Sequence, residues 1–188
     1  AGTYDEQLSI NKPLSLLGPN ESISAVTGTR NPEAILKQNI QIASNSSDVT
    51  VSGFEFFEVS NSAIKIFGDS ENLEFQNNRF IDINSDAIRS QFQINSKDII
   101  VKGNFIEGID DGSSTGILLY GINGTSIISD NKIDLAFNGT PSGYSGIQVP
   151  SATDLIISGN EISNTTNQGL QVANVSGNVI IENNTIFN

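Results

Sequence analysis

The sequence predicts an all-β fold, a right-handed parallel β-helix built as a single-stranded solenoid with about seven coils and three short sheets. Two recurring patterns predict it, and both alternate apolar and polar residues over three to five positions. A period of two is typical of short strands, whereas helical solenoids require a 3.6-residue period over ten or more residues. The lean composition, with 37% hydrophobic and 7% aromatic residues, suits the narrow core of a solenoid.

The first pattern reads apolar-x-apolar-x-(Gly/Asn/Asp)-(Asn/Phe)-x-(Ile/Phe). It recurs at residues 49–56, 73–80, 99–106, 126–133, 155–162 and 179–186. We interpret its first half as the strands of a second sheet and its centre as a tight turn. A file of asparagines then occupies that turn: Asn78, Asn104, Asn131, Asn160 and Asn184. Stacked side-chain amides satisfy a buried turn, so we expect these residues to be structural.

The second pattern, small-apolar-x-apolar, predicts the strands of the first sheet. Its central Ile or Leu lies at positions 64, 88, 117, 147 and 170. Two earlier segments, 8–10 and 40–42, extend the first sheet to seven strands. Ser126 at a core position and Phe54 in place of a turn asparagine predict local irregularities. Between residues 20 and 38 the coil is longer, and we expect a short helix near residues 32–36.

The opening segment, residues 2–18, and the repeats resemble the pectate-lyase-like superfamily. The chain is most similar to its generic parallel β-helix repeat members, such as NosD-type proteins and carbohydrate-binding and sugar-hydrolysis domains. The resemblance covers nearly the whole chain and implies the fold. It does not specify an activity, because the superfamily hosts many chemistries.

Composition and charge exclude several classes of partner and site. The formal net charge is −12, and 9 Lys and Arg face 21 Asp and Glu, so we expect no nucleic-acid partner. The chain has no Cys and no His, which excludes disulfides, thiolate sites, the usual zinc sites and histidine triads. Apolar stretches are too short to span a bilayer, so we expect no membrane insertion.

The resemblance implies that a ligand binds along the outer face of the first sheet, with the loops that enter the sheet as one wall. Alternation points Ser9 and Leu118 outward on this face, together with most of the candidate ligand-binding residues. These candidates are Gln41, Lys65, Arg89, Tyr120, Tyr144, Gln148 and Gln171. Lys65 and Arg89 should lie on adjacent coils, about 5 Å apart along the axis.

Two functions fit this face. The first is a non-catalytic domain that binds carbohydrate or acts as a rigid structural or adhesive spacer. Amide side chains offer both donors and acceptors to sugar hydroxyls, and tyrosines stack on sugar rings. The acidic, Asn-rich and Cys-free composition places this domain outside the cell or at the cell surface, with the periplasm as an alternative. For a non-catalytic domain, the presence of Lys65 and Arg89 is explained by charge balance with nearby acidic residues on a solvated sheet.

The alternative is a polysaccharide lyase or a related carbohydrate-active enzyme that acts on acidic glycans. Lyases of this fold remove a proton next to a uronate carboxylate. Here Lys65 or Arg89 would act as the base if a neighbouring cation lowers its pKa, and Tyr120 or Tyr144 would return the proton. No cofactor is required, but calcium is a candidate ion because it prefers carboxylate oxygens. Its candidate ligands are Asp86, Glu107, Asp110 and Asp111.

We expect residues 1–188 to form a single domain that is part of a longer protein. The sequence predicts no capping element at either end of the solenoid. End-to-end contacts with neighbouring domains or chains are therefore expected, because an uncapped solenoid exposes an unpaired strand edge and an apolar cross-section.

Overall fold

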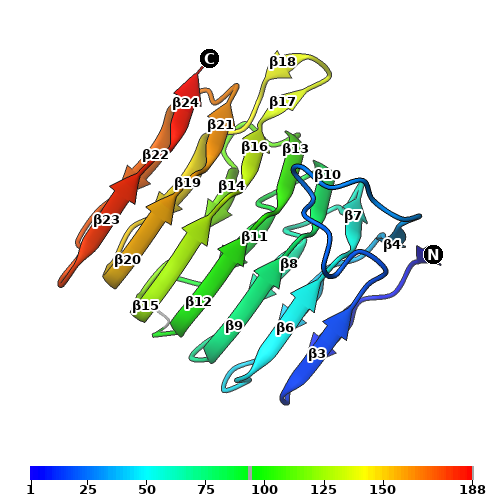
Figure 1. Ribbon diagram of the computed structural model, residues 1–188, viewed down its shortest axis with the longest axis horizontal. Coiled ribbons are helices and arrows are strands. Elements are labelled where there is room, and N and C mark those ends of the chain that lie inside the picture. The colour runs from blue at the N-terminus through cyan, green and yellow to red at the C-terminus, as the bar shows by residue number, and fades with distance from the viewer. Residues whose placement is uncertain (93–94, 188) are drawn as a thin grey trace.

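A computed structural model of the chain describes residues 1–92 and 95–187 as a stack of coils, each containing three short strands joined by turns (Figure 1). Each strand pairs in parallel with its counterpart in the next coil. The described residues form no helix. The predicted parallel β-helix is therefore confirmed.

Three sheets run the length of the stack. The first sheet contains β2 (Leu8–Ile10), β5 (Ile40–Ile42), β8 (Ile64–Ile66), β11 (Ile88–Ser90), β14 (Thr115–Leu118), β19 (Ser145–Val149) and β22 (Gln168–Val172). The second contains β3 (Leu14–Leu17), β6 (Val49–Ser52), β9 (Glu71–Gln76), β12 (Lys97–Lys102), β15 (Ile122–Ser129), β20 (Ala152–Ser158) and β23 (Val179–Glu182). The third contains β1 (Gly2–Tyr4), β4 (Ala34–Leu36), β7 (Glu55–Phe57), β10 (Arg79–Ile83), β13 (Phe105–Ile109), β16 (Lys132–Asp134), β21 (Glu161–Ser163) and β24 (Thr185–Phe187).

The first sheet has the seven predicted strands, five from the second pattern and two from the earlier segments at residues 8–10 and 40–42. The second sheet has one strand more than the first pattern predicted, β3. Six full windings separate the first and last strands of the first sheet, slightly fewer than the seven coils expected. One small antiparallel hairpin, β17 (Ala136–Phe137) with β18 (Thr140–Pro141), projects from the stack between β16 and β19 (Figure 1). Its two-residue turn, Asn138-Gly139, is a common hairpin signal that the sequence analysis missed.

The short helix expected near residues 32–36 is wrong, because Ala34–Leu36 form strand β4. Ala34 and Leu36 are buried while Ile35 is only partly buried, which is the alternation of a strand. β4 pairs with β1 on one side and with β7 on the other. These pairings, with partners up to 32 residues away in the sequence, override the local helical preference.

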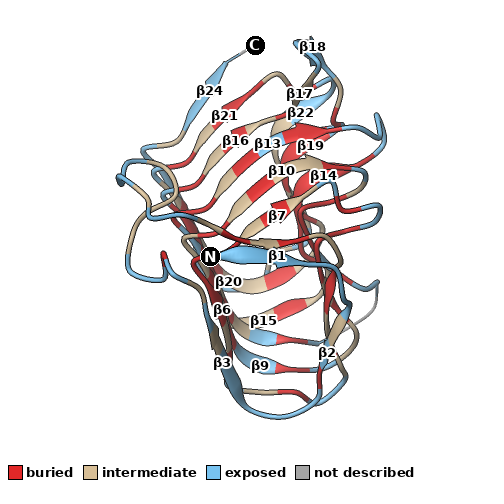
Figure 2. Ribbon diagram, turned by 90° about the vertical axis from the view of Figure 1, so that its right-hand side faces the viewer, coloured by how far each residue is buried: buried red, intermediate tan, exposed pale blue. Residues whose placement is uncertain are grey.

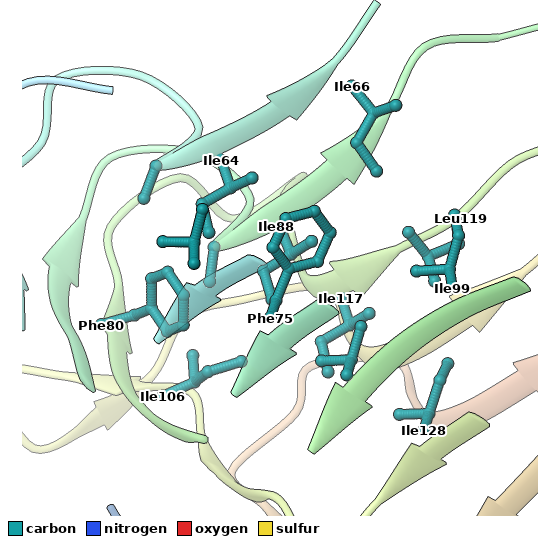
Figure 3. Packing of buried hydrophobic residues seen from close by; sticks show 14 of the residues in the cluster. Ile64, Ile66, Phe75, Phe80, Ile88, Ile99, Ile106, Ile117, Leu119 and Ile128 are labelled. Carbon is teal, nitrogen blue, oxygen red and sulfur yellow. The ribbon is translucent and has the colours of Figure 1, made fainter. Parts of the chain in front are cut away.

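The core is a thin column of side chains that point inward from all three sheets (Figure 3), and Figure 2 marks the buried residues along the strands. Isoleucines stack on one another along the first sheet, with Ile64, Ile88 and Ile117 in register and fully buried. In the third sheet the rings of Phe56 and Phe80 stack, with their centroids 4.9 Å apart. Each coil therefore buries its apolar residues against the coils above and below it.

A ladder of asparagines fills the turn between the second and third sheets, as predicted. The Oδ1 atom of each of Asn104, Asn131, Asn160 and Asn184 accepts hydrogen bonds from the backbone N–H and the side-chain amide of the asparagine in the preceding coil. Each side-chain amide also donates to a strand carbonyl, as Asn104 does to Phe75 at 2.8 Å. The ladder stops at Phe54, whose N–H donates to Asn78 Oδ1.

The residue before the ladder position has a positive φ in successive coils, which explains why the repeat demands Gly, Asn or Asp there. These residues are Gly53, Asn77, Gly103, Asp130, Gly159 and Asn183. Left-handed backbone is accessible to glycine and, at moderate cost, to Asn and Asp, but strained for other residues.

The local irregularity predicted at Ser126, a serine in a core position, is present in the structure. Its hydroxyl oxygen is buried and accepts a hydrogen bond from the N–H of Ile99 at 3.2 Å. The pairing register between β12 and β15 shifts next to this point. The hydroxyl therefore satisfies a backbone donor at a place where the regular ladder is interrupted.

The long segment between β3 and β4 folds back along the Asn-ladder turns of later coils (Figure 1). The N–H of Ala25 donates to the carbonyl of Gly103, and Arg30 Nη1 donates to the carbonyl of Asn77. Asn20, which is fully buried, joins the two ends of the segment through hydrogen bonds with Asn31 and Glu33. This segment forms a wall beside the outer face of the third sheet.

The end strands β1, β3 and β24 are coloured mostly as exposed in Figure 2, and large apolar residues are among the exposed residues at both ends of the stack. They include Tyr4, Leu14 and Leu17 at one end and Val179–Ile181, Ile186 and Phe187 at the other. The assignment of residues 1–188 as one domain of a longer protein, and the end-to-end contacts, stay predictions.

Candidate functional site

The outward residues of the first sheet form one file across seven strands. The strand register aligns Ser9, Gln41, Lys65, Arg89, Leu118, Gln148 and Gln171. Period-two alternation had predicted this file, and the register confirms the placement. Leu118 is buried although it points outward, so the middle of the file is apolar and its two halves are polar.

Lys65 and Arg89 are direct neighbours on β8 and β11. They line a hollow of about 220 Å³ together with Asn61, Ser62, Ile66, Phe67, Ser85 and Gln91. The pKa of Lys65 lies below its ordinary value, first because of partial burial and second because of the nearby Arg89 guanidinium. The Asp86 carboxylate opposes this shift. The pair is therefore a cationic site with a lysine that loses its proton more readily than usual.

Asp86 holds this site in place from the loop that enters β11. Its carboxylate accepts a hydrogen bond from the N–H of Thr115 at 2.7 Å and pairs with Arg89 Nη1 at 3.1 Å. The side chain is only 2% exposed, and burial raises its pKa above the ordinary value. The hydrogen bond from Thr115 and the charge of Arg89 oppose that shift but are smaller than the effect of burial.

An aromatic pair lies near the end of β11 and β14. The rings of Phe92 and Tyr120 meet edge to face, with their centroids 5.3 Å apart. Phe92 is 64% exposed and was missed by sequence reasoning, because it follows the strand and belongs to no repeated pattern. Tyr144, by contrast, is exposed on the loop that enters β19, where its N–H donates to the carbonyl of Ser114.

The two glutamines at the C-terminal end of the file are partly buried. Gln148 Oε1 accepts a long hydrogen bond of 3.5 Å from Thr115 Oγ1. Gln171 Oε1 is buried and has no hydrogen-bond partner among the described residues. An amide oxygen without a donor is a position that a ligand hydroxyl or a water molecule would satisfy.

A family model described as the right handed beta helix region matches residues 38–188. The chain belongs to this right-handed beta helix family. No curated protein and no solved structure matches the chain. Membership of the right-handed beta helix family gives the handedness and stacking of the coils, whereas the role of each outward residue has to be argued from the geometry of this chain.

The right-handed beta helix places the four acidic candidates for calcium in different surroundings. Asp86 is buried against Arg89 and Thr115, and Glu107 is exposed on the outer face of the third sheet. Asp111 accepts hydrogen bonds from Ser113 and Ser114 in its own loop, which lowers its pKa, while Asp110 lines a separate hollow with Glu58 and Asp82. Within residues 1–92 and 95–187, no three metal-ligating side chains converge. Calcium binding stays a prediction.

No helix that is long and apolar enough to span a membrane is found among the described residues.

Proposed function

We propose that the outer face of the first sheet binds carbohydrate chains without cleaving them. The observation that carries this proposal is the in-register file of Gln41, Lys65 and Arg89 beside a hollow of about 220 Å³. Adjacent members of the file are spaced by the distance between strands, about 4.8 Å. A rigid array of donors and acceptors at that spacing suits an extended chain of sugars with repeated hydroxyls.

The aromatic pair supports the same proposal. Phe92 exposes most of its ring, and Tyr120 fixes that ring from the side. Sugar rings present apolar C–H faces, which pack on exposed aromatic rings, while their hydroxyls bond to neighbouring polar groups. Location outside the cell or at its surface, with the periplasm as the alternative, belongs to the same proposal.

The test is a glycan array probed with the purified chain and with three variants. Lys65→Gln and Phe92→Ala should each weaken binding by about tenfold, because each removes one principal contact. Lys102→Gln is the matched control, since Lys102 is an exposed cation that points outward on the second sheet. No binding of the parent chain to any glycan would favour a rigid spacer and overturn the proposal.

A second candidate function, a polysaccharide lyase, is favoured by one observation, the lowered pKa of Lys65 beside Arg89. In that reaction neutral Lys65 takes the proton next to a uronate carboxylate, the glycosidic oxygen leaves, and Tyr120 supplies a proton to it. The products are unsaturated uronates that absorb ultraviolet light. Release of such products by the parent chain, and its loss in Lys65→Gln, would replace the non-catalytic proposal with this one.

A further inference from the structure

A second file of side chains crosses the outer face of the third sheet, away from the proposed glycan face. The register aligns Glu55, Arg79, Phe105, Lys132 and Glu161 on five consecutive strands. The order is acid, cation, aromatic ring, cation, acid. The guanidinium of Arg79 lies over the ring of Phe105, with 5.6 Å between Cζ and the ring centroid.

The segment between β3 and β4 turns the middle of this file into a hollow. Ala25, Val26, Gly28 and Arg30 form one wall, and Arg79, Phe105 and Lys132 complete the lining around a volume of about 340 Å³. The hydrogen bond from the N–H of Ala25 to the carbonyl of Gly103 holds the wall in place. Arg30 is fixed by Glu33 and by the carbonyls of Ile23 and Asn77. The site is therefore formed by two elements that are firmly connected.

The side chains that line the hollow include cations, and each of these cations is paired with a glutamate outside the lining: Arg30 with Glu33, Arg79 with Glu55 and Lys132 with Glu161. Three of the nine Lys and Arg residues line the hollow, and among the described residues no carboxylate does, although the formal net charge of the chain is −12. The carboxylates that pair with Arg79 and Lys132 belong to Glu55 and Glu161, which lie at the outer ends of the file. The two neighbours of Phe105 in the file, Arg79 and Lys132, are therefore both cations.

The ion pair of Lys132 leaves this cation able to exchange partners. Lys132 and Glu161 are 37% and 42% exposed, and exposed pairs of this kind contribute little because solvent screens them. Glu55 is partly buried, and burial raises its pKa despite the opposing charge of Arg79. A carboxylate ligand placed between Arg79 and Lys132 can therefore compete with Glu161 for Lys132. Arg79 bonds to Glu55 through Nη1, and its guanidinium carries further N–H donors for a ligand.

We propose that this hollow is a binding site for a small organic carboxylate with an apolar body. Arg79 and Lys132 bind the carboxylate, while Phe105 and Val26 contact the apolar part. A guanidinium presents parallel donors that match the two oxygens of a carboxylate. The proposal does not depend on carbohydrate binding at the first sheet.

Benzoate is the probe, and benzamide, which has the same shape without the charge, is the matched control ligand. Each is titrated into the chain at low ionic strength while amide resonances are followed by NMR. We expect benzoate to cause saturable shifts at Val26 and Phe105, whereas benzamide binds at least about tenfold more weakly, since it lacks the charge-assisted contacts.

Two variants test the cations, and circular dichroism checks that each is folded. Arg79→Gln and Lys132→Gln should each weaken benzoate binding by about tenfold. Lys132→Gln carries the test even if Arg79→Gln unfolds the chain, because the partner of Lys132 is an exposed glutamate. Lys102→Gln and Lys65→Gln should bind benzoate as the parent chain does.

The proposal would be overturned by the absence of a saturable shift with benzoate, by equal binding of benzamide, or by parent-like binding of benzoate to folded Lys132→Gln. Loss of benzoate binding in Lys65→Gln alone would also overturn it, because the anion would then be bound at the first sheet.

Discussion

Asn104 Oδ1 accepts two hydrogen bonds from Asn78, one from its backbone N–H at 2.9 Å and one from its side-chain amide at 3.3 Å. Asn104 in turn donates to the carbonyl of Phe75 and to Asn131 Oδ1. One side chain therefore satisfies polar groups of the coils on both sides of it. In a fold whose coils contact only their neighbours, such bridges connect the stack lengthwise.

Asn104→Ala should lower the free energy of unfolding by about 3 kcal/mol, because it leaves buried donors and acceptors without partners on both sides. Asn184→Ala is the comparison, since Asn184 is the last member of the ladder, bonds to one neighbouring asparagine and is more exposed. It should cost about 1 kcal/mol. Urea unfolding followed by circular dichroism measures both values. Equal losses would show that the ladder does not act through its two-sided bridges.

Gly124→Ala should destabilise the chain by about 2 kcal/mol, for two separable reasons. Gly124 has a φ of +67°, and an added Cβ would lie 2.3 Å from Asp98 Oδ1. Asp98 would then have to move and lose its hydrogen bond to the N–H of Thr125 at 2.8 Å. Gly139→Ala isolates the backbone cost, because Gly139 has a φ of +74° and open space around it.

The Gly139 variant should cost about 1 kcal/mol, measured by the shift of the urea midpoint. If the two alanine variants lose the same stability, the contact with Asp98 is accommodated without cost, and only the backbone conformation requires glycine.

Ser126→Ala should cost about 1 to 2 kcal/mol, because the buried N–H of Ile99 loses an acceptor, Ser126 Oγ. Ser126→Thr is the control, since it keeps the hydroxyl and adds a methyl group in an apolar interior. Hydrogen exchange of the Ile99 amide should accelerate in the alanine variant more than in the threonine variant. An unchanged exchange rate would show that this hydrogen bond is not important there.

Most of the fold could be predicted from the sequence, because each coil repeats the same pattern of apolar strand positions and turn residues. Inward Ile64, Ile88 and Ile117 define the first sheet, and the residues with positive φ explain the Gly, Asn or Asp of the turn. The segment at residues 32–36 could not be predicted. Its three consecutive apolar residues fit a helix or a strand, and the choice depends on pairing with β1 and β7.

The candidate site was predictable only in part. Alternation placed Lys65 beside Arg89, because outward residues of parallel strands must align. It did not reveal that Leu118 is buried or that Phe92 joins Tyr120, since neither depends on the period of a strand. The hollow of the third sheet was missed because its wall comes from a segment about eighty residues away from Phe105.

Asp86→Asn should change how stability depends on pH. Burial raises the pKa of Asp86 in the folded chain above its ordinary value of 3.8. The charged groups that interact with Asp86 are Arg89 and Lys65. In the window between 3.8 and the raised value, the folded state binds this proton more tightly than the unfolded state. The contribution of Asp86 to the free energy of unfolding therefore falls when the pH rises through that window.

The measurement is urea unfolding of the parent and of Asp86→Asn at several values between about pH 3 and pH 7. The stability of the parent minus that of the variant should fall as the pH rises. Asp111→Asn is the control of opposite sign, because hydrogen bonds from Ser113 lower the pKa of Asp111. Its contribution is present above the ordinary value and is lost as the pH falls, so the corresponding difference should rise with pH. A difference for Asp86 that also rises would mean that Arg89 and Thr115 outweigh burial and hold the carboxylate in its charged form.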